Sequence, residues 1–298
     1  MSARLLAIVC ALVLLPAPAA FARAAAAVTV AQSKAKAPDT SAADQQAAEA
    51  IALMDQAIEE RNAEAAQTQL RRYEELWGKV SPKMLKKVIG SVVALFKQFH
   101  PRDDFDLELQ PRLPGDIAPR EVEDTGRREL LQTYRLAAGV LYDKPEGREV
   151  ILSILKISHV RSWPDIVATL VEGLGYQPDA GLTAVIKPYL DDPSPMICGA
   201  AANALSQLHD EPIAVRREAV AALVKAYSAA QEAADKERRR AKPQAGDEGE
   251  SPPTPAADRL VLMEVPFGLS LQKLTRQSFP DPAGWQQWFD EHGKDATW

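Results

Sequence analysis

Histidine is the first residue type to examine for chemistry, because imidazole binds metals and transfers protons near neutral pH. The chain has four histidines, His100, His159, His209 and His292. No two of them lie within one helical turn, and none stands in the H-E-x-x-H spacing of zinc peptidases. His159 and His209 follow predicted helix C-termini, where the helix dipole favours an imidazolium. We therefore expect structural histidines and no metal ligand.

Cys198 is the candidate nucleophile of the chain. A catalytic cysteine needs a lowered pKa and a base close to it. Cys198 lies in an alanine-rich segment with no charged residue within one helical turn along the sequence. The sequence therefore predicts a buried thiol that packs as a small apolar side chain.

An acidic segment suggests calcium at first sight. Asp104, Asp106 and Glu108 alternate along the chain, and Asp103 stands beside them. The segment lacks the glycine at position six and the terminal glutamate of an EF-hand loop. We interpret it as a solvated acidic loop and predict no metal there.

A G-x-G pattern at Gly173 and Gly175 begins like a dinucleotide-binding loop. Pro178 stands where the third glycine of that motif belongs, and the preceding segment has the periodicity of a helix, not of a strand. The sequence contains neither a G-x-S-x-G motif nor a Walker motif. We predict no catalytic, cofactor-binding or metal-ligating residue and no bound cofactor.

A basic run of Lys236, Arg238, Arg239, Arg240 and Lys242 ends a predicted helix. It has two interpretations: a solvated helix end, where cations suit the dipole, or a docking patch for an acidic partner or surface. We favour the first, because the acidic segment that follows neutralises part of the charge. The formal net charge of the chain is -6. This argues against general nucleic-acid binding, since phosphate neutralisation needs a basic face.

The elements that would position these residues repeat along the chain. Pro145, Pro178 and Pro212 each follow a short polar turn and precede a helical pattern, at spacings of 33 and 34 residues. A period in the thirties with two helices per unit is typical of an α-solenoid. The sequence therefore predicts an all-α fold, an α-solenoid of stacked antiparallel helix pairs.

The paired helices follow from the apolar periodicity and from the prolines that start them. Their predicted ranges are 146–158 with 164–174, 179–190 with 195–208, and 212–240 with 258–274. A short tail helix is expected over 282–292. Residues 41–142 are predicted helical with a weaker repeat, with helix starts at Asn62 and at Ser81-Pro82 and a last helix over 122–142.

Residues 1–22 have the features of a signal peptide. Arg4 supplies the positive start, Leu5 to Leu15 is an apolar run short for a membrane span, and Ala20-Phe21-Ala22 matches a cleavage site. An uncleaved anchor is the alternative. A lipid anchor on Cys10 is less favoured, because the preceding residue is not small. We expect an exported protein, periplasmic or secreted after cleavage near Ala22.

The rest of the chain divides by composition. We predict a disordered spacer over 23–40, the helical-repeat solenoid over 41–240 with an irregular loop at 100–122, and a flexible Pro-rich linker over 241–257. The segment 258–298 is expected to form a closing helix and a cap that contains tryptophan.

Two segments resemble a known family. The turn Tyr189 to Pro195 (YLDDPSP), followed by the alanine-rich run 200–205, resembles a HEAT repeat, in which the Asp-Pro turn caps the second helix. Leu274 to Phe279, then Asp281, Trp285 and Trp288, is similar to the tail of exported bacterial HEAT-repeat proteins. Arg276 replaces the glycine expected in that tail, and Phe289 stands where a third tryptophan often does. The resemblance implies a stack of helix pairs that binds other molecules, and it implies no reaction.

The tail aromatics are expected to share one helix face, because Trp285, Trp288 and Phe289 stand at i, i+3 and i+4. A helix this short needs a docking surface to be stable. We expect it to dock onto the 258–274 helix, against Leu262, Leu269 or Leu271.

Two functional hypotheses follow. The first is a non-enzymatic, exported HEAT-repeat scaffold that mediates protein–protein interaction, with a protein partner, no nucleic acid and no membrane contact apart from the targeting segment. The alternative is an accessory protein that binds a small molecule or pigment, with bilin-lyase-like activity, since some HEAT-like proteins attach bilins. No residue of the sequence is assigned to that chemistry.

Overall fold

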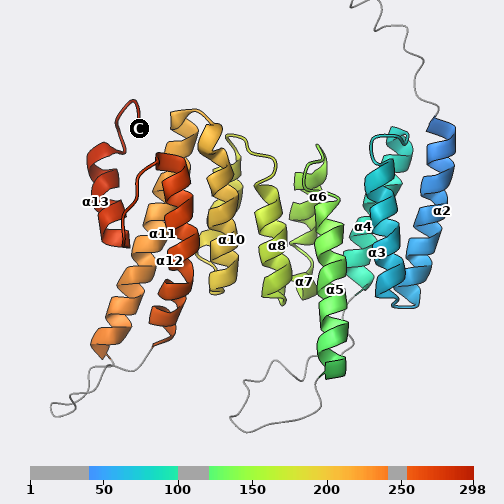
Figure 1. The fold of residues 1–298 in the computed structure, drawn as a ribbon, viewed down its shortest axis with the longest axis horizontal. Helices are drawn as coiled ribbons and strands as arrows, with labels where there is room; N and C mark the ends of the chain where they lie inside the picture. Colours follow the sequence, from blue (N-terminus) through green and yellow to red (C-terminus); the bar gives the residue numbers. More distant parts are fainter. Residues whose placement is uncertain (1–39, 100–120, 241–253) are drawn as a thin grey trace, which may run out of the picture. The chain divides into compact units, whose positions relative to one another are not determined.

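The computed structural model describes residues 40–99, 121–240 and 254–298, and of residues 121–127 the backbone alone. Within these ranges the chain forms helices and no strand, which confirms the all-α prediction for them (Figure 1). The predicted signal peptide and nearly all of the spacer lie outside the described residues. So do almost all of the predicted 100–122 loop and residues 241–253 of the predicted linker.

The helices are named as in Figure 1. The first group is α2 (Thr40–Glu59), α3 (Ala63–Leu76), α4 (Pro82–Gln98), α5 (Glu121–Gly139), α6 (Gly147–Ile154) and α7 (Ser158–Arg161). The second group is α8 (Pro164–Leu174), α9 (Leu182–Leu190), α10 (Pro195–Ser206), the 3-10 turn η2 (Gln207–Asp210), α11 (Ile213–Arg240), α12 (Pro255–Thr275) and α13 (Pro282–His292).

Short polar side chains start the helices where the sequence predicts them. Asn62 Oδ1 accepts a hydrogen bond from the Ala65 amide at 3.0 Å, which satisfies one of the free amides of α3. Ser81 caps α4 in the same way, through the Met84 amide at 3.3 Å. The Ser81 hydroxyl and amide also donate to the Asp44 carboxylate at 2.6 and 2.7 Å. These bonds lower the pKa of Asp44 and join α2 to the start of α4.

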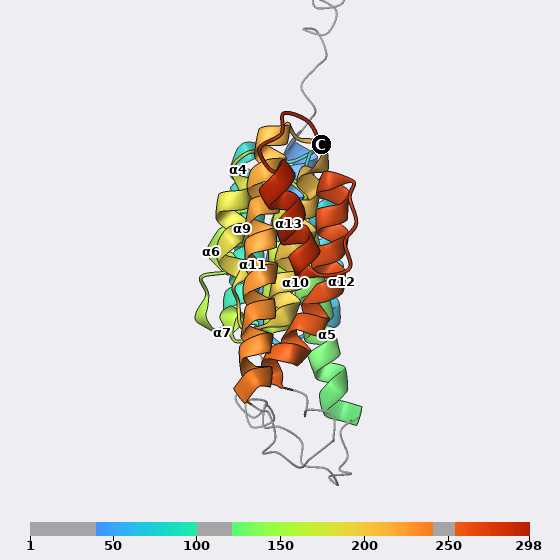
Figure 2. The same ribbon diagram turned by 90° about the vertical axis from the view of Figure 1, so that its left-hand side faces the viewer.

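Helices distant in the sequence pack side by side in a regular order. α3 packs against α5, α5 against α8, α8 against α10, and α10 against α12. In a second row, α4 packs against α6, and α9 packs against α11. The consecutive helices α9 and α10 also pack together, as do α11 and α12 (Figure 2). Their apolar faces bury one continuous core.

Glycine and alanine permit the closest of these contacts. A Cβ on Gly173 would lie 2.0 Å from the Tyr142 ring, and one on Gly175 would lie 2.7 Å from the Ala204 Cα. The G-x-G pattern is therefore explained by helix packing, because its glycines face a side chain and a backbone instead of a phosphate.

The predicted single helix over 146–158 is wrong. α6 ends at Ile154, and Ile157 adopts an extended conformation (φ −70°, ψ 126°) before α7 begins at Ser158. Arg161 Nε donates to the Leu155 carbonyl at 3.0 Å, which satisfies one of the acceptors that the break leaves free. The break places His159 Nε2 2.6 Å from the Phe96 carbonyl at the end of α4. This partner is 63 residues away, so local periodicity does not reveal the break.

Other boundaries differ by a few residues. The helix predicted to end at 142 stops at Gly139, and the Tyr142 hydroxyl instead donates to the Thr169 carbonyl of α8 at 2.8 Å. α9 begins at Leu182, three residues after its predicted start. α12 begins at Pro255, because Thr254 caps it through the Ala257 amide at 3.3 Å. The last three residues of the predicted linker are therefore helical.

The C-terminal helix α13 packs against α11 (Figure 2). Trp285 is 1% exposed and Trp288 is 8% exposed, with their rings 6.3 Å apart. The expectation that they pack on Leu262 or Leu269 is wrong, since those side chains are 62% and 59% exposed. The face that the aromatics cover belongs mainly to α11, so the predicted docking onto the 258–274 helix is wrong as well.

Arg276 ends α12 in the left-handed conformation, at φ 61° and ψ 17°, and its amide donates to the Gln272 carbonyl at 2.7 Å. A left-handed conformation costs a residue with a Cβ about 1–2 kcal/mol. Arg276 is exposed. We expect Arg276→Gly to raise the free energy of unfolding by about 0.5–1 kcal/mol, because the relief of strain outweighs the greater unfolded-state entropy of glycine. Urea titration measures the change; Arg276→Ala, which keeps the strain, should give no gain.

Candidate functional site

The described histidines are held by polar neighbours. Besides the contact of His159 with the Phe96 carbonyl, His209 lies 3.1 Å from Asp210 Oδ2, and His292 Nδ1 lies 3.0 Å from Asp295 Oδ2. His100 lies outside the described residues, as does the acidic run at 103–108. In the ranges that the structure describes, no group of three or more His, Cys, Asp or Glu side chains has metal-binding geometry.

Cys198 is buried, as predicted, but it has a charged neighbour that the sequence does not indicate. Its thiol donates to the Asp192 carbonyl at 3.0 Å, and Arg259 Nη2 lies 3.4 Å from the sulfur. Arg259 also donates to the Asp192 carbonyl at 2.6 Å, so it ties α12 to the turn before α10. Burial raises the pKa of the Cys198 thiol, and Arg259 opposes that shift.

The thiol should therefore react slowly in the native protein. We expect native Cys198 to react with a disulfide reagent at least about 100-fold more slowly than in urea, because a neutral buried thiol must become exposed and ionised first. A Cys10→Ala background leaves Cys198 as the one thiol to be measured. Fast labelling of the native form would contradict a packing role and make Cys198 a nucleophile candidate again.

The described part of the basic run is exposed at the end of a helix, which fits both of its interpretations. Lys236, Arg238, Arg239 and Arg240 stand at the end of α11, and Arg238 pairs with Asp235 at 3.0 Å. The remaining member of the run, Lys242, lies outside the described residues. Glu237 Oε2 accepts the Ala256 amide at 3.0 Å, which links the end of α11 to the start of α12.

A groove of about 460 Å³ runs along α5, α8, α10 and α12. Its small lining residues are Ala168 of α8 and Gly199 and Ala200 of α10, and we call these three its floor. We call its larger apolar lining residues, Met196, Leu262 and Pro266, the wall. Its polar lining residues, which we call the polar side, are Arg135, Asp165, Thr169, Glu172 and Asn203. The name "groove" refers below to this surface.

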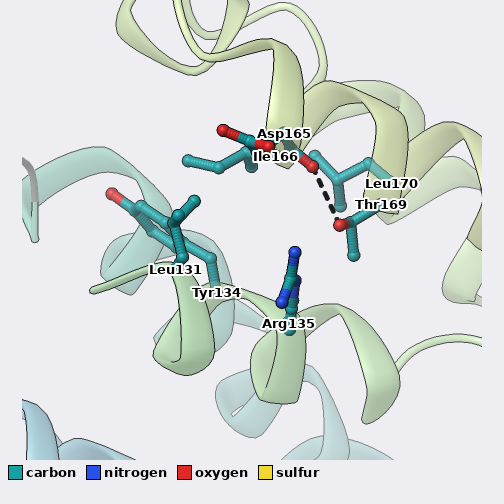
Figure 3. Close-up of a pocket in the computed structure, with 7 residues that line it drawn as sticks. All are labelled: Leu131, Tyr134, Arg135, Asp165, Ile166, Thr169 and Leu170. Carbon is teal, nitrogen blue, oxygen red and sulfur yellow. Dashed lines mark hydrogen bonds between the residues drawn. The ribbon is translucent and has the colours of Figure 1, made fainter. Parts of the chain in front are cut away.

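The groove continues into a narrower hollow between α5 and α8. Figure 3 shows Arg135 of α5 pointing toward Asp165 and Thr169 of α8, with Leu131 and Tyr134 beside it. This hollow is too narrow to admit a water molecule. The wider groove beside it is therefore the part of this surface that can receive another molecule.

The polar side of the groove carries charges of both signs. Arg135 and Glu172 are exposed, and the charges of both act on the Tyr142 hydroxyl. Burial, and then the negative charge of Glu172, raise the pKa of Tyr142, while Arg135 lowers it. The groove is thus an amphipathic surface with an apolar wall and a charged rim.

The comparisons with known proteins give no relative. No family model matches the chain, and neither a curated protein nor a solved structure matches it. None of the helices in the described ranges is long and apolar enough to cross a membrane. The HEAT resemblance therefore rests on the sequence motifs alone.

The groove is not predicted by the sequence patterns. Its lining runs from Arg135 to Pro266 and comes from four helices. The alanine-rich segment 200–205 was the one available signal, because small residues leave room on a helix surface. Which residues border that room depends on the helices packed beside it.

Proposed function

We propose that this protein is a non-enzymatic α-solenoid scaffold of the HEAT type that binds a segment of another protein in the groove. The observation that carries the proposal is the groove itself, with its small-residue floor and apolar wall. The order of contacts α3, α5, α8, α10 and α12 supports a solenoid, because repeat units contact mainly their sequence neighbours.

The groove favours an amphipathic helical segment as its ligand. Ala168 and Ala200 let a backbone approach closely, whereas Gly199 already packs against Pro266 of α12. Met196, Leu262 and Pro266 offer apolar contact. Glu172 at the rim is exposed and suits a basic side chain of the partner. Helix-in-groove recognition uses apolar anchors spaced one turn apart, which matches a wall of this kind.

The site of action is proposed from the sequence. The features of residues 1–22 support export, so that the protein acts in the periplasm or after secretion, once cleaved near Ala22. The partner should therefore be another exported protein.

The pigment-binding alternative remains a prediction from the resemblance. The groove volume of about 460 Å³ lies within the usual range for small-molecule pockets. A chromophore that co-purifies with the protein and absorbs visible light would support it over the scaffold proposal.

Site-specific photo-cross-linking tests the scaffold proposal. A photoreactive residue at position 196 in the native envelope should yield a discrete cross-linked protein, which is then purified and titrated directly. Asn203→Arg, which fills the groove, should weaken binding at least about 10-fold. Ala184→Arg adds the same side chain to the exposed surface of α9 and should leave binding unchanged. Equal binding by both variants would overturn the proposal.

A further inference from the structure

The outer face of α12 carries an uncovered apolar stripe. Val261, Leu262, Val265 and Leu269 are 63%, 62%, 66% and 59% exposed, and we call these four residues the α12 stripe. They account for four of the seven exposed large hydrophobic side chains among the described residues. The buried residues of α12, such as Phe267 and Leu271, lie on the opposite face, which packs on α10 and α11.

The outer faces of α11 and α12 differ in whether another helix covers them. At the C-terminal end, α13 covers α11 with Trp285 and Trp288. The outer side of α12 has no helix of the described chain against it in Figure 2. Monomeric proteins rarely expose a contiguous row of large aliphatic side chains, and such rows mark interaction surfaces. The α12 stripe therefore needs a partner from outside the described chain.

The charges that flank the stripe indicate which partner fits. Exposed Asp258 precedes the stripe, and exposed Glu264 stands beside Val265 within its span. Exposed Lys273 follows it, with its Nζ donating to Gln207 Oε1 at 3.2 Å, and Arg276 stands close behind. The neighbouring cation Arg259 is held by the Asp192 carbonyl, so the carboxylate of Asp258 sets the charge at that end. The stripe is thus acidic at its N-terminal end and basic at its C-terminal end.

This pattern is complementary to itself when reversed. The spacings between residues 258, 262, 265, 269 and 273 are 4, 3, 4 and 4. In the reverse direction they are 4, 4, 3 and 4, so the two orders differ only at the central residue. In an antiparallel pair of α12 helices, Asp258 of each copy faces Lys273 of the other copy. Within one copy, Asp258 and Lys273 lie about 22 Å apart along the helix axis. Leu262 faces Leu269, and Val265 lies near the two-fold axis. Such an isologous contact is the usual way in which a patch pairs with itself.

We propose that two copies of this chain associate through their α12 stripes in an antiparallel, two-fold arrangement. This surface adjoins the groove, and Leu262 belongs to both. Self-association is independent of the scaffold proposal, because it requires no second protein.

Sedimentation of the purified full chain over a range of concentrations tests the proposal. The wild type should form dimers at concentrations on the order of tens of micromolar, and Val265→Lys should weaken dimerisation at least about 100-fold. That position is exposed in the single copy, so the variant should unfold at the wild-type temperature at concentrations where both proteins are monomeric. Leu53→Lys, at a 36% exposed leucine of α2, is the control and should dimerise like the wild type. A wild type that stays monomeric at about 200 μM would overturn the proposal.

Charge reversal tests the antiparallel register. Asp258→Lys alone and Lys273→Glu alone each place like charges opposite each other and should weaken dimerisation about 10-fold at low salt. The double variant restores opposite charges across the interface and should dimerise like the wild type. If these charges act instead on the stability of α12 through the helix dipole, the double variant should unfold at a lower temperature and its dimerisation should stay weak. Single variants that dimerise normally would overturn the antiparallel arrangement.

Discussion

Trp285→Ala is expected to lower the free energy of unfolding by about 4 kcal/mol. Trp285 is the largest fully buried side chain of the described residues, at 1% exposure. Its ring packs edge-on against Phe279 at 4.9 Å and against Trp288 at 6.3 Å between centroids. An alanine leaves a cavity that α13 cannot refill, because the helix has only 11 residues and depends on docking.

The aromatic contacts continue beyond Trp285. Trp288 packs against Trp298 at 5.5 Å, and the Arg216 guanidinium lies over the Trp298 ring at 5.3 Å. Arg216 also donates to the Leu274 carbonyl at 2.9 Å, which ties α11 to the end of α12. Loss of Trp285 should therefore loosen the whole C-terminal cap and not a single contact.

Thermal and urea unfolding measure the Trp285 effect. Trp288→Ala should cost about 3 kcal/mol, somewhat less because Trp288 is 8% exposed. Phe289→Ala is the comparison variant: Phe289 stands on the same helix but is only partly buried, so it should cost less than either tryptophan. If Trp285→Ala leaves the midpoint unchanged, α13 is not a structural cap.

Gly147→Ala is expected to lower the free energy of unfolding by about 3 kcal/mol. A Cβ at this position would lie 1.8 Å from the Leu141 carbonyl oxygen and 2.9 Å from Gln177 Nε2. Backbone cannot move aside as a flexible side chain does, so the turn before α6 must shift. Gln177 Nε2 donates to the carbonyls of Tyr142 and Lys144, at 3.0 and 2.5 Å, and these bonds would be strained as well.

A glycine-to-alanine substitution at Gly90 should change the free energy of unfolding in the opposite direction. Gly90 is exposed within α4, and a Cβ there would meet nothing within 4 Å. Gly90→Ala should raise the free energy of unfolding by about 1 kcal/mol, because alanine favours the helix. Urea titration of the two variants together separates a steric effect from a general effect of adding a methyl group. Equal changes at both positions would contradict the close contact at Gly147.

Local sequence patterns predict the secondary structure to within a few residues at most places. Pro164 and Pro195 start their helices where predicted, and the helices at 164–174 and 282–292 have the predicted bounds. Helix formation depends on hydrogen bonds four residues apart and on capping groups next to them, so a local pattern is sufficient. The shared face of Trp285 and Trp288 follows from the same geometry.

Packing between distant helices determines which side chains are buried, and local patterns do not predict this. Leu269 and Leu271 are both apolar and stand in one helix, yet one is 59% exposed and the other is fully buried. Cys198 meets Arg259 across 61 residues, and α13 docks on α11 and not mainly on the helix that precedes it. Which face of a helix is covered depends on neighbours far away in the chain. The groove, the α12 stripe and the surroundings of Cys198 therefore exist only once those helices are packed together.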